Sequence, residues 1–152
     1  MLIIKQIQDF QSLLFAKNIR YEVFCKEQFV SPEADWDNKD SFNYLAYYDN
    51  VPVGTMRWRE VGKVIKLERL CVLKDYRNKH IARNILIKVL DDIEKYLNDR
   101  NKQQDKTTVT KLLLHAQLPV IPLYESLGFV KQGKIFLEEG IKHFTMIKEV
   151  NL

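Results

Sequence analysis

The chain has 152 residues, of which 46% are hydrophobic, and this length is close to the roughly 150 residues of one domain. Such a chain can bury a core without disulfides or a metal, which excludes intrinsic disorder as a global description. Its 24 Lys plus Arg exceed its 20 Asp plus Glu, and the net charge of +4 favours an anionic partner, either a phosphate-bearing small molecule or a nucleic acid.

The first part of the chain predicts a strand, a helix and a long loop. Residues 2–6 form the strand, and Asp9 is the expected N-cap of a helix over residues 10–24. The helix should lie on a sheet or on another helix, because it carries an apolar stripe of Leu13, Phe15, Ala16, Ile19, Val23 and Phe24. Residues 27–40 are polar and acidic, and we expect an irregular loop with at most one helical turn there.

A series of strands and a long helix come next. Residues 44–48 and 53–60 predict a hairpin, and a further strand covers residues 64–73. From Ile81 the apolar period becomes helical, with one face formed by Ile81, Ile85, Leu86, Val89, Leu90, Ile93 and Leu97. The polar residues 98–108 predict a loop after this helix.

The last part of the chain predicts a parallel crossover. Residues 112–114 form a short strand that ends at His115, and a helix over residues 119–127 stops at Gly128. Two more strands follow, the last over residues 142–149. The order predicts a mixed α/β (α+β) fold with antiparallel strands before the long helix and a parallel crossover after it. Ligands bind such sheets where strand ends meet helix N-termini, which points to residues 72–83.

The turn before the long helix is basic. The N–H groups and the positive dipole end of a helix N-terminus attract phosphate, and cations would add charge there. These cations are Lys74, Arg77, Lys79 and Arg83. The alternative is a solvated basic turn without a ligand.

The cysteines and the hydropathy pattern point to the cytoplasm. Cys25 and Cys71 are isolated and lack the spaced partners of a metal finger, so we expect two buried thiols and no metal site. The N-terminal apolar run is too short for a signal peptide. No stretch approaches the roughly 20 apolar residues of a membrane span, so we expect a cytoplasmic protein without a membrane partner.

Two blocks of the sequence resemble the GNAT acyltransferases, a family that uses acetyl-CoA. Residues 77–82, Arg-Asn-Lys-His-Ile-Ala, are similar to the family signature Arg/Gln-x-x-Gly-x-Gly/Ala, and residues 117–129 resemble its Asn-x-x-Ala-x-x-Leu-Tyr-x-x-x-Gly-Phe pattern. Shorter matches to the ElaA-type branch extend the resemblance over about residues 13–147. It implies a single GNAT-like domain over residues 1–152, with a mostly antiparallel central sheet flanked by helices and a splayed strand pair at the cofactor site.

The resemblance also implies where acetyl-CoA binds. Backbone groups of residues 70–72 would pair with the pantetheine arm and polarise the thioester carbonyl, and N–H groups of residues 78–83 would cradle the pyrophosphate. The expected cofactor-binding residues are Leu70, Cys71, Val72, Arg77, Asn78, Lys79, His80, Ile81, Ala82, Arg83, Gln117 and Tyr124. His80 stands at the first motif glycine, which predicts binding that is retained but weakened.

The resemblance implies that Tyr124 is the general acid, because the family tyrosine at this position protonates the departing CoA thiolate. A tyrosine that only packs in the core is the alternative. Three residues are candidates for the base that deprotonates the amine: Glu68, His143 and Glu27. Each has a structural alternative, which for Glu68 is an ion pair with an arginine of the neighbouring strand.

Together these features predict an N-acetyltransferase that moves an acetyl group from acetyl-CoA to a primary amine by direct attack. The acidic residues Glu33, Asp35, Asp37 and Asp40 either receive a cationic acceptor or form a solvated loop. A CoA-binding sensor without catalysis is the alternative function, favoured by His80 at the glycine position. The sequence has no basic stripe interleaved with aromatic residues, so we expect no nucleic acid partner. GNAT relatives often pair, so a homodimer is one option.

Overall fold

Seven strands form one sheet in the computed structural model, which describes residues 1–34, 40–102 and 108–150. Their order across the sheet is β1-β2-β3-β4-β5-β7-β6, and β4 and β5 are the parallel neighbours in an otherwise antiparallel sheet. The strands are β1 (Leu2–Gln6), β2 (Phe42–Tyr48), β3 (Val51–Val61), β4 (Val64–Val72), β5 (Lys111–Gln117), β6 (Val130–Glu138) and β7 (Ile141–Glu149). The predicted mixed fold with a parallel crossover is confirmed.

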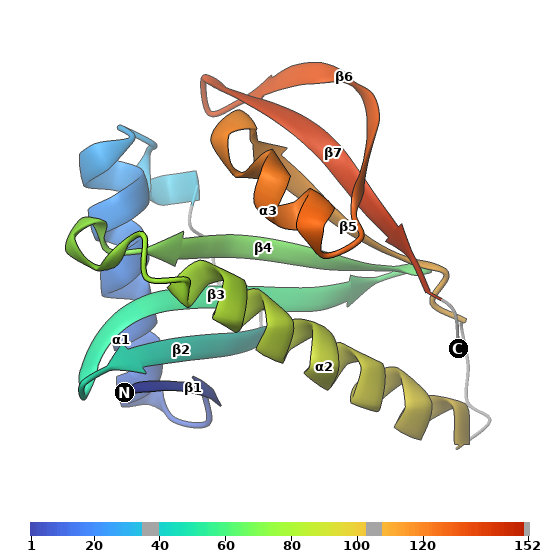
Figure 1. Ribbon diagram of the computed structural model, residues 1–152, viewed down its shortest axis with the longest axis horizontal. Helices are drawn as coiled ribbons and strands as arrows, with labels where there is room; N and C mark the ends of the chain where they lie inside the picture. The colour runs from blue at the N-terminus through green and yellow to red at the C-terminus, as the bar shows by residue number, and fades with distance from the viewer. Residues whose placement is uncertain (35–39, 103–107, 151–152) are drawn as a thin grey trace.

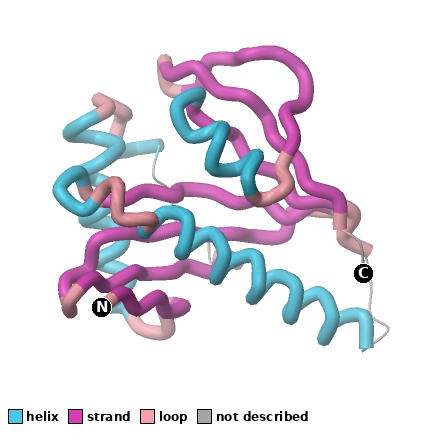
Figure 2. Tube along the Cα trace, in the orientation of Figure 1, coloured by secondary structure: helices cyan, strands magenta, loops and turns pink. Residues whose placement is uncertain are grey.

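Helices cover both faces of this sheet. In Figure 1, α1 (Phe10–Arg20) lies behind the sheet and α2 (Ile81–Lys102) crosses in front of it. Figure 2 shows the same layers, with the helices on either side of the strands. The shorter helical segments are η1 (Tyr21–Glu27, a π-helix), η2 (Pro32–Ala34), η3 (Lys74–Tyr76), η4 (Leu118–Val120) and α3 (Ile121–Ser126).

The sheet buries apolar side chains on both faces, which explains the strong apolar character of its central strands. Leu45 packs with Ala16 and Ile19 of α1, whereas its neighbours Tyr44 and Ala46 belong to the core that α2 covers. This alternation is the period of two that a strand imposes. α2 therefore contributes its predicted apolar face to the larger core. Of the predicted stripe, Ala16 and Ile19 of α1 and Val23 of η1 enter the smaller core, whereas Phe15 is exposed.

The first helix begins as predicted and ends differently. The Asp9 side chain accepts a hydrogen bond from the Ser12 N–H at 2.8 Å, so Asp9 is the N-cap. The α-helix stops at Arg20, and the π-helix η1 continues the chain to Glu27, beyond the predicted end at residue 24. Short π-helical segments are frequent at functional sites, and this one leads to the site described below.

Other boundaries also differ from the prediction, and the helix predicted over residues 119–127 is divided into η4 and α3. α2 extends to Lys102, so the polar residues 98–102 are helical. β5 extends to Gln117 because β7 provides partners for its whole length, with Gln117 opposite His143. Asp35 and Asp37 lie outside the described residues. Residues 103–107 of the loop predicted between α2 and β5 lie outside them as well.

The structure also bears on the predictions for the two cysteines and for membrane-spanning helices. Cys71 is buried and Cys25 is half-buried, and neither forms a disulfide in the described part of the chain. None of the described helices combines the length and the apolar character that crossing a bilayer requires.

Candidate active site

β4 and β5 pair only over their first halves. The register runs from Val64 opposite Lys111 to Leu67 opposite Leu114. Beyond this point β4 continues beside β3, and β5 continues beside β7. The two parallel strands therefore open into a V at their carboxyl ends, which confirms the predicted splayed pair. We call this opening the splay, and it lies where sheets of this type bind ligands.

A β-bulge distorts β4 at the start of the splay. Arg69 has a left-handed backbone conformation with φ 61°, and the register between β3 and β4 shifts between Thr55 and Arg57. Bulges re-aim the groups that follow them and are common next to active sites. The sequence has no local signal for this bulge, because a non-glycine residue occupies the left-handed position.

The peptide groups of Val72 point into the splay. The Leu73 N–H donates to the Val53 carbonyl of β3 at 2.8 Å. Because hydrogen-bonding direction alternates along an antiparallel strand, the N–H and carbonyl of Val72 face away from β3. The Arg77 Nε–H donates to that Val72 carbonyl at 2.9 Å, in agreement with this direction. The Val72 N–H is thus oriented as a donor toward the opening.

The turn before α2 contains two left-handed residues, one of them at the first glycine position of the motif. Asn78 and His80 both have left-handed conformations, with φ 63° and 61°. The His80 carbonyl accepts hydrogen bonds from the N–H and the side-chain amide of Asn84 at 3.0 and 2.9 Å, so His80 precedes the first helical turn. A left-handed residue here explains why glycine suits this position, and the exposed His80 side chain leaves the turn intact.

The start of α2 fits a phosphate group. The N–H groups of Ile81, Ala82 and Arg83 belong to the first helical turn, where no intrahelical acceptor is available. Lys74 and Lys79, in the segment that precedes the helix, are exposed. Amide donors and cations at a helix N-terminus are the donor set that a pyrophosphate requires.

Arg77 contacts protein groups. Its guanidinium donates to both carboxylate oxygens of Glu27, at 2.9 and 2.7 Å, in addition to the Val72 carbonyl. This fork geometry is the strong form of an arginine–carboxylate pair. The guanidinium is therefore engaged on three sides, which disfavours its predicted role as a phosphate ligand. The same contact gives Glu27 a structural role as an ion-pair partner that fixes the end of η1, in place of a role as a base.

The other cations of the turn have weaker partners. The Arg83 guanidinium donates to the Ser126 hydroxyl at 2.8 Å and so connects α2 with α3. The Lys79 ammonium lies 5.6 Å from the centre of the Tyr48 ring. Lys79 is exposed and Arg83 is half-buried, so a bound anion can compete for the Lys79 ammonium at low energetic cost.

α3 places Tyr124 in the core beside the splay. Its side chain is 7% exposed, and its ring packs edge to face on Phe129 with centroids 5.9 Å apart. Burial and, to a lesser extent, the charge of a Cys71 thiolate raise the pKa of Tyr124 well above its ordinary value. The phenol carries a proton at physiological pH, as an ordinary tyrosine also does, and its raised pKa makes it a weaker acid.

Glu68 is held in an ion-pair cluster. The Arg59 Nε–H donates to one carboxylate oxygen at 2.8 Å, and the Arg57 Nε lies 3.4 Å from the same oxygen. Burial alone would raise the pKa of Glu68, but the hydrogen bond from Arg59 and the charges of Arg57, Arg59 and Lys66 together lower it. A carboxylate stabilised in its ionised form is a weak base. The geometry therefore favours the structural alternative for Glu68.

His143 has a ring nitrogen that can accept a proton. The side chain is 5% exposed, and its Nδ1 lies 2.7 Å from the Ile141 carbonyl, so Nδ1 carries the hydrogen of the neutral ring. Nε2 is then the ring nitrogen without a hydrogen, which can take up a proton. It lies 3.7 Å from a carboxylate oxygen of Glu138, which would stabilise the protonated ring. Glu138 also contacts His115 Nδ1 at 3.0 Å. Sequence reasoning missed Glu138, since only strand pairing brings it to these histidines.

Gln117 at the end of β5 pairs with Gln28. The Gln117 amide donates to the Gln28 oxygen at 2.9 Å, and the Gln28 amide donates back at 3.3 Å. The sequence predicts Gln117 as a cofactor-binding residue and assigns no role to Gln28. The structure brings the two together beside the splay.

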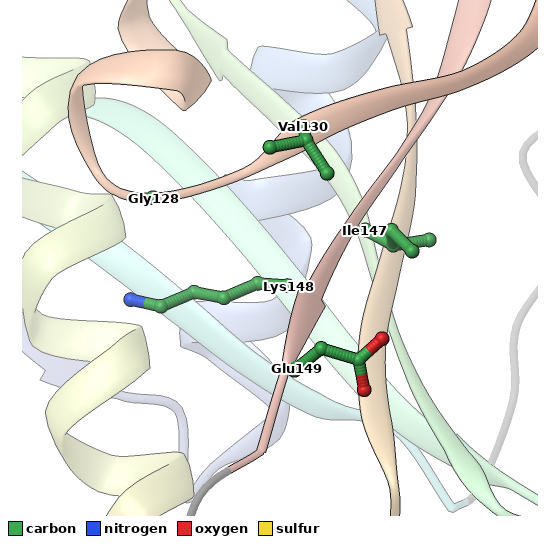
Figure 3. A pocket seen from close by; sticks show the side chains of 5 residues that line it. All are labelled: Gly128, Val130, Ile147, Lys148 and Glu149. Carbon is green, nitrogen blue, oxygen red and sulfur yellow. The ribbon is translucent and has the colours of Figure 1, made fainter.

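A surface pocket lies elsewhere on the molecule (Figure 3). It has a volume of about 300 Å³ and is lined by Gly128, Val130, Ile147, Lys148 and Glu149. The Lys148 ammonium donates to the Leu127 carbonyl at 2.9 Å, next to the carboxyl end of α3. The pocket shares no lining residue with the splay, so we do not assign it to the same site.

Comparison with known proteins agrees with this geometry. A family model described as the acetyltransferase (GNAT) domain matches residues 8–150. The uncharacterized N-acetyltransferase YjcF of Bacillus subtilis strain 168 is 36% identical over 134 residues, which cover 86% of this chain and 88% of that protein.

Two solved structures share the fold. Escherichia coli ElaA has a TM-score of 0.77 at 21% identity, covering 98% of this chain and 100% of that one. The PaiA N-acetyltransferase of Thermoplasma acidophilum, solved in complex with coenzyme A, has a TM-score of 0.68 at 16% identity and covers 99% of both chains. From the family match over most of its length and the splayed sheet, the chain belongs to the GNAT family of acetyltransferases.

Proposed function

We propose that the protein is an N-acetyltransferase that transfers the acetyl group of acetyl-CoA to a primary amine by direct attack. The observation that carries this proposal is the splay, with the Val72 peptide group directed into it and the protonated Tyr124 beside it. Family membership supports the acetyl group, and the donor set at the start of α2 supports a pyrophosphate-bearing co-substrate.

Named residues would hold this co-substrate. The backbone of Leu70, Cys71 and Val72 would pair with the pantetheine arm along the open edge of β4. The pyrophosphate would meet the amides of the α2 N-terminus and the turn before it. The residues of that turn and helix start are Asn78, Lys79, His80, Ile81, Ala82 and Arg83. Acetyl-CoA supplies the acetyl thioester when it is bound.

Three groups of the chain would carry the chemistry. The Val72 N–H would stabilise the negative charge that develops on the carbonyl oxygen under attack. The Tyr124 hydroxyl would give its proton to the sulfur as the carbon–sulfur bond breaks. The His143 Nε2 would take the proton that the amine loses, directly or through an ordered water. The carbon–nitrogen bond forms as the carbon–sulfur bond breaks. An ammonium acceptor loses two protons: the first passes through His143 to solvent before the attack, and the second, lost once the carbon–nitrogen bond has formed, replaces the proton that Tyr124 gives to the sulfur.

The acceptor is proposed to be cationic before it loses its proton. The Glu33 carboxylate on η2 is exposed and accepts a hydrogen bond from the Ser31 hydroxyl, which lowers the pKa of Glu33. Asp40 is also exposed. The ionised Glu33 carboxylate would attract an ammonium group by long-range electrostatics.

Release of CoA in the presence of amines tests the proposal. A thiol-reactive dye should report steady CoA formation from acetyl-CoA with at least one member of a panel of primary amines. A blank with protein alone is needed, because Cys25 is half-buried and adds its own signal. Binding of acetyl-CoA by calorimetry without any turnover would instead support the CoA-binding sensor. No binding at millimolar acetyl-CoA would contradict both functions.

A further inference from the structure

Two consecutive residues at the end of η1 contact opposite sides of the splay. The Glu27 carboxylate binds Arg77 at 2.7 and 2.9 Å, and Arg77 in turn holds the Val72 carbonyl at the end of β4. The neighbouring Gln28 exchanges two hydrogen bonds with Gln117 at the end of β5, at 2.9 and 3.3 Å. The chain thus spans the gap between two strands that no longer pair with each other, near the ends of β4 and β5 in Figure 1.

The end of η1 is itself fixed in place. The Val30 N–H donates to the Phe24 carbonyl at 2.8 Å, and the Phe29 N–H donates to the Cys25 carbonyl at 3.1 Å. Phe29 has a left-handed conformation with φ 60°, the usual geometry of a helix C-terminus but an unfavourable one for phenylalanine. The contacts at the helix end therefore hold Glu27 and Gln28 in fixed positions relative to the sheet.

We propose that Glu27, Gln28, Arg77 and Gln117, which we call the bridge, are positioning residues that set the separation of β4 and β5 across the splay. The bridge also fixes the Val72 peptide group through Arg77. This inference rests on the proposed acetyl transfer, in which Val72 and Tyr124 must face the same reacting carbonyl. It gives Arg77 a role in place of the phosphate contact that the sequence predicts.

The bridge should affect the rate of transfer more than the binding of acetyl-CoA. A displacement of about 1 Å at reacting groups can cost about 100-fold in rate. The N–H groups at the start of α2 that would hold the pyrophosphate are fixed by the helix itself, so we expect them to keep their positions without Glu27 or Gln28. Loss of the bridge should therefore lower kcat and leave acetyl-CoA affinity nearly unchanged.

Single substitutions separate this role from phosphate binding. Glu27→Gln keeps the size of the side chain and removes its charge. Arg77→Lys keeps the charge and removes the two parallel hydrogen bonds that the guanidinium donates to Glu27. We expect each to lower kcat by about 10-fold or more, with the Kd of acetyl-CoA changed by less than about twofold. If Arg77 binds phosphate instead, Arg77→Lys raises this Kd, and Glu27→Gln lowers it by releasing the guanidinium; that pattern contradicts the bridge.

Double variants test whether the partners act as pairs. The Glu27→Gln/Arg77→Lys variant should have nearly the kcat of the worse single variant, because both substitutions break one contact. Gln28→Ala and Gln117→Ala should be non-additive in the same way. Lys26→Gln is a matched control, since it removes an exposed ion pair with Glu22 in the same π-helix, and it should change neither kcat nor Kd. Additive losses within both pairs would overturn the proposal.

Amide hydrogen exchange of the protein without ligand keeps the bridge testable if no acceptor is found. The Val30 N–H reports on the end of η1, and the Leu73 N–H reports on the end of β4. In Glu27→Gln both amides should exchange at least about threefold faster than in Lys26→Gln. Unchanged exchange would contradict the bridge. Faster exchange as expected, together with no turnover of any amine, would contradict only the proposed function.

Discussion

Leu67 of β4 and Leu114 of β5 are the last paired residues of the two parallel strands, and both belong to the core that α2 covers. The closed end of the splay is therefore apolar and tightly packed. Its open end carries the Val72 peptide group and the amide of Gln117. A rigid apolar base of this kind holds polar groups in place at the open end, which is what electrostatic stabilisation of a reacting carbonyl requires.

Tyr124→Phe should lower kcat by about 100-fold, because general acid catalysis contributes about 100-fold or more and no other hydroxyl is assigned this role. The Kd of acetyl-CoA should change little, since the phenyl ring keeps its packing on Phe129. Steady-state CoA release and calorimetry measure the two quantities. A variant with unchanged kcat would remove Tyr124 from the mechanism.

His80→Gly and His80→Ala form a matched pair at a left-handed position. Both remove the imidazole, but glycine adopts φ 61° without the steric cost that a Cβ imposes. We expect the glycine variant to be more stable than the alanine variant by about 1 kcal/mol, and to bind acetyl-CoA more tightly than the wild type. Urea unfolding and calorimetry give these values. Equal stability of the two variants would contradict the conformational argument.

The sequence predicts those elements whose signals are local. The Asp9 cap, the start of α2 at Ile81 and the antiparallel strands are confirmed, because capping and apolar period act over a few residues. α2 continues to Lys102 because residues 98–102 contain neither glycine nor proline to stop it. The length of β5 depends on β7, which is distant in the chain, so its last residues could not be assigned from the sequence.

The candidate site also combines local features, which the sequence predicts, with contacts between distant residues, which it does not predict. The turn of residues 77–83 is a local motif, and the left-handed His80 stands at its first glycine position. The pairing of Arg77 with Glu27 joins residues 50 positions apart, and the pairing of Gln28 with Gln117 joins residues 89 positions apart. A single sequence contains no signal for such pairs. The cluster around Glu68 was foreseeable as an alternative because its arginines lie on the neighbouring strand of a predicted hairpin.

Glu68→Gln should destabilise the fold in a pH-dependent way. At pH 7 we expect a loss of about 1 to 3 kcal/mol in the free energy of unfolding, because Arg57 and Arg59 lose a charged partner. The pKa of Glu68 is lowered in the folded state, so its contribution is present above the unfolded pKa and is lost as the pH falls through the folded pKa. The difference between wild type and variant should therefore shrink below about pH 4.

Urea unfolding between pH 7 and pH 3 measures this difference. Glu22→Gln is the control, since its ion pair with Lys26 is exposed and should contribute less than about 0.5 kcal/mol at any pH. A Glu68→Gln loss that stays constant down to pH 3 would show that the ionised carboxylate is not the stabilising form.

His143→Gln should lower kcat by about 100-fold if Nε2 accepts the amine proton, because glutamine cannot act as a base. His115→Gln is the comparison variant, since it changes the other histidine of the Glu138 contact, which is more exposed. It should retain kcat within about threefold. Equal losses in the two variants would point to a structural role for the whole cluster. Thermal unfolding of both variants checks that the fold is retained.

Gly54→Ala should destabilise the protein by about 1 to 3 kcal/mol through overpacking. A Cβ at Gly54 would lie 2.9 Å from the Ile85 Cδ1 of α2 and 3.3 Å from the Cys71 carbonyl oxygen. Ile85→Val removes that Cδ1 atom and alone should cost about 1 kcal/mol. The double variant should therefore lose less stability in urea than the sum of the single losses. Ile93→Val, two turns further along α2, should combine additively with Gly54→Ala; additivity with Ile85→Val as well would show that the contact does not limit the packing of α2 on β3.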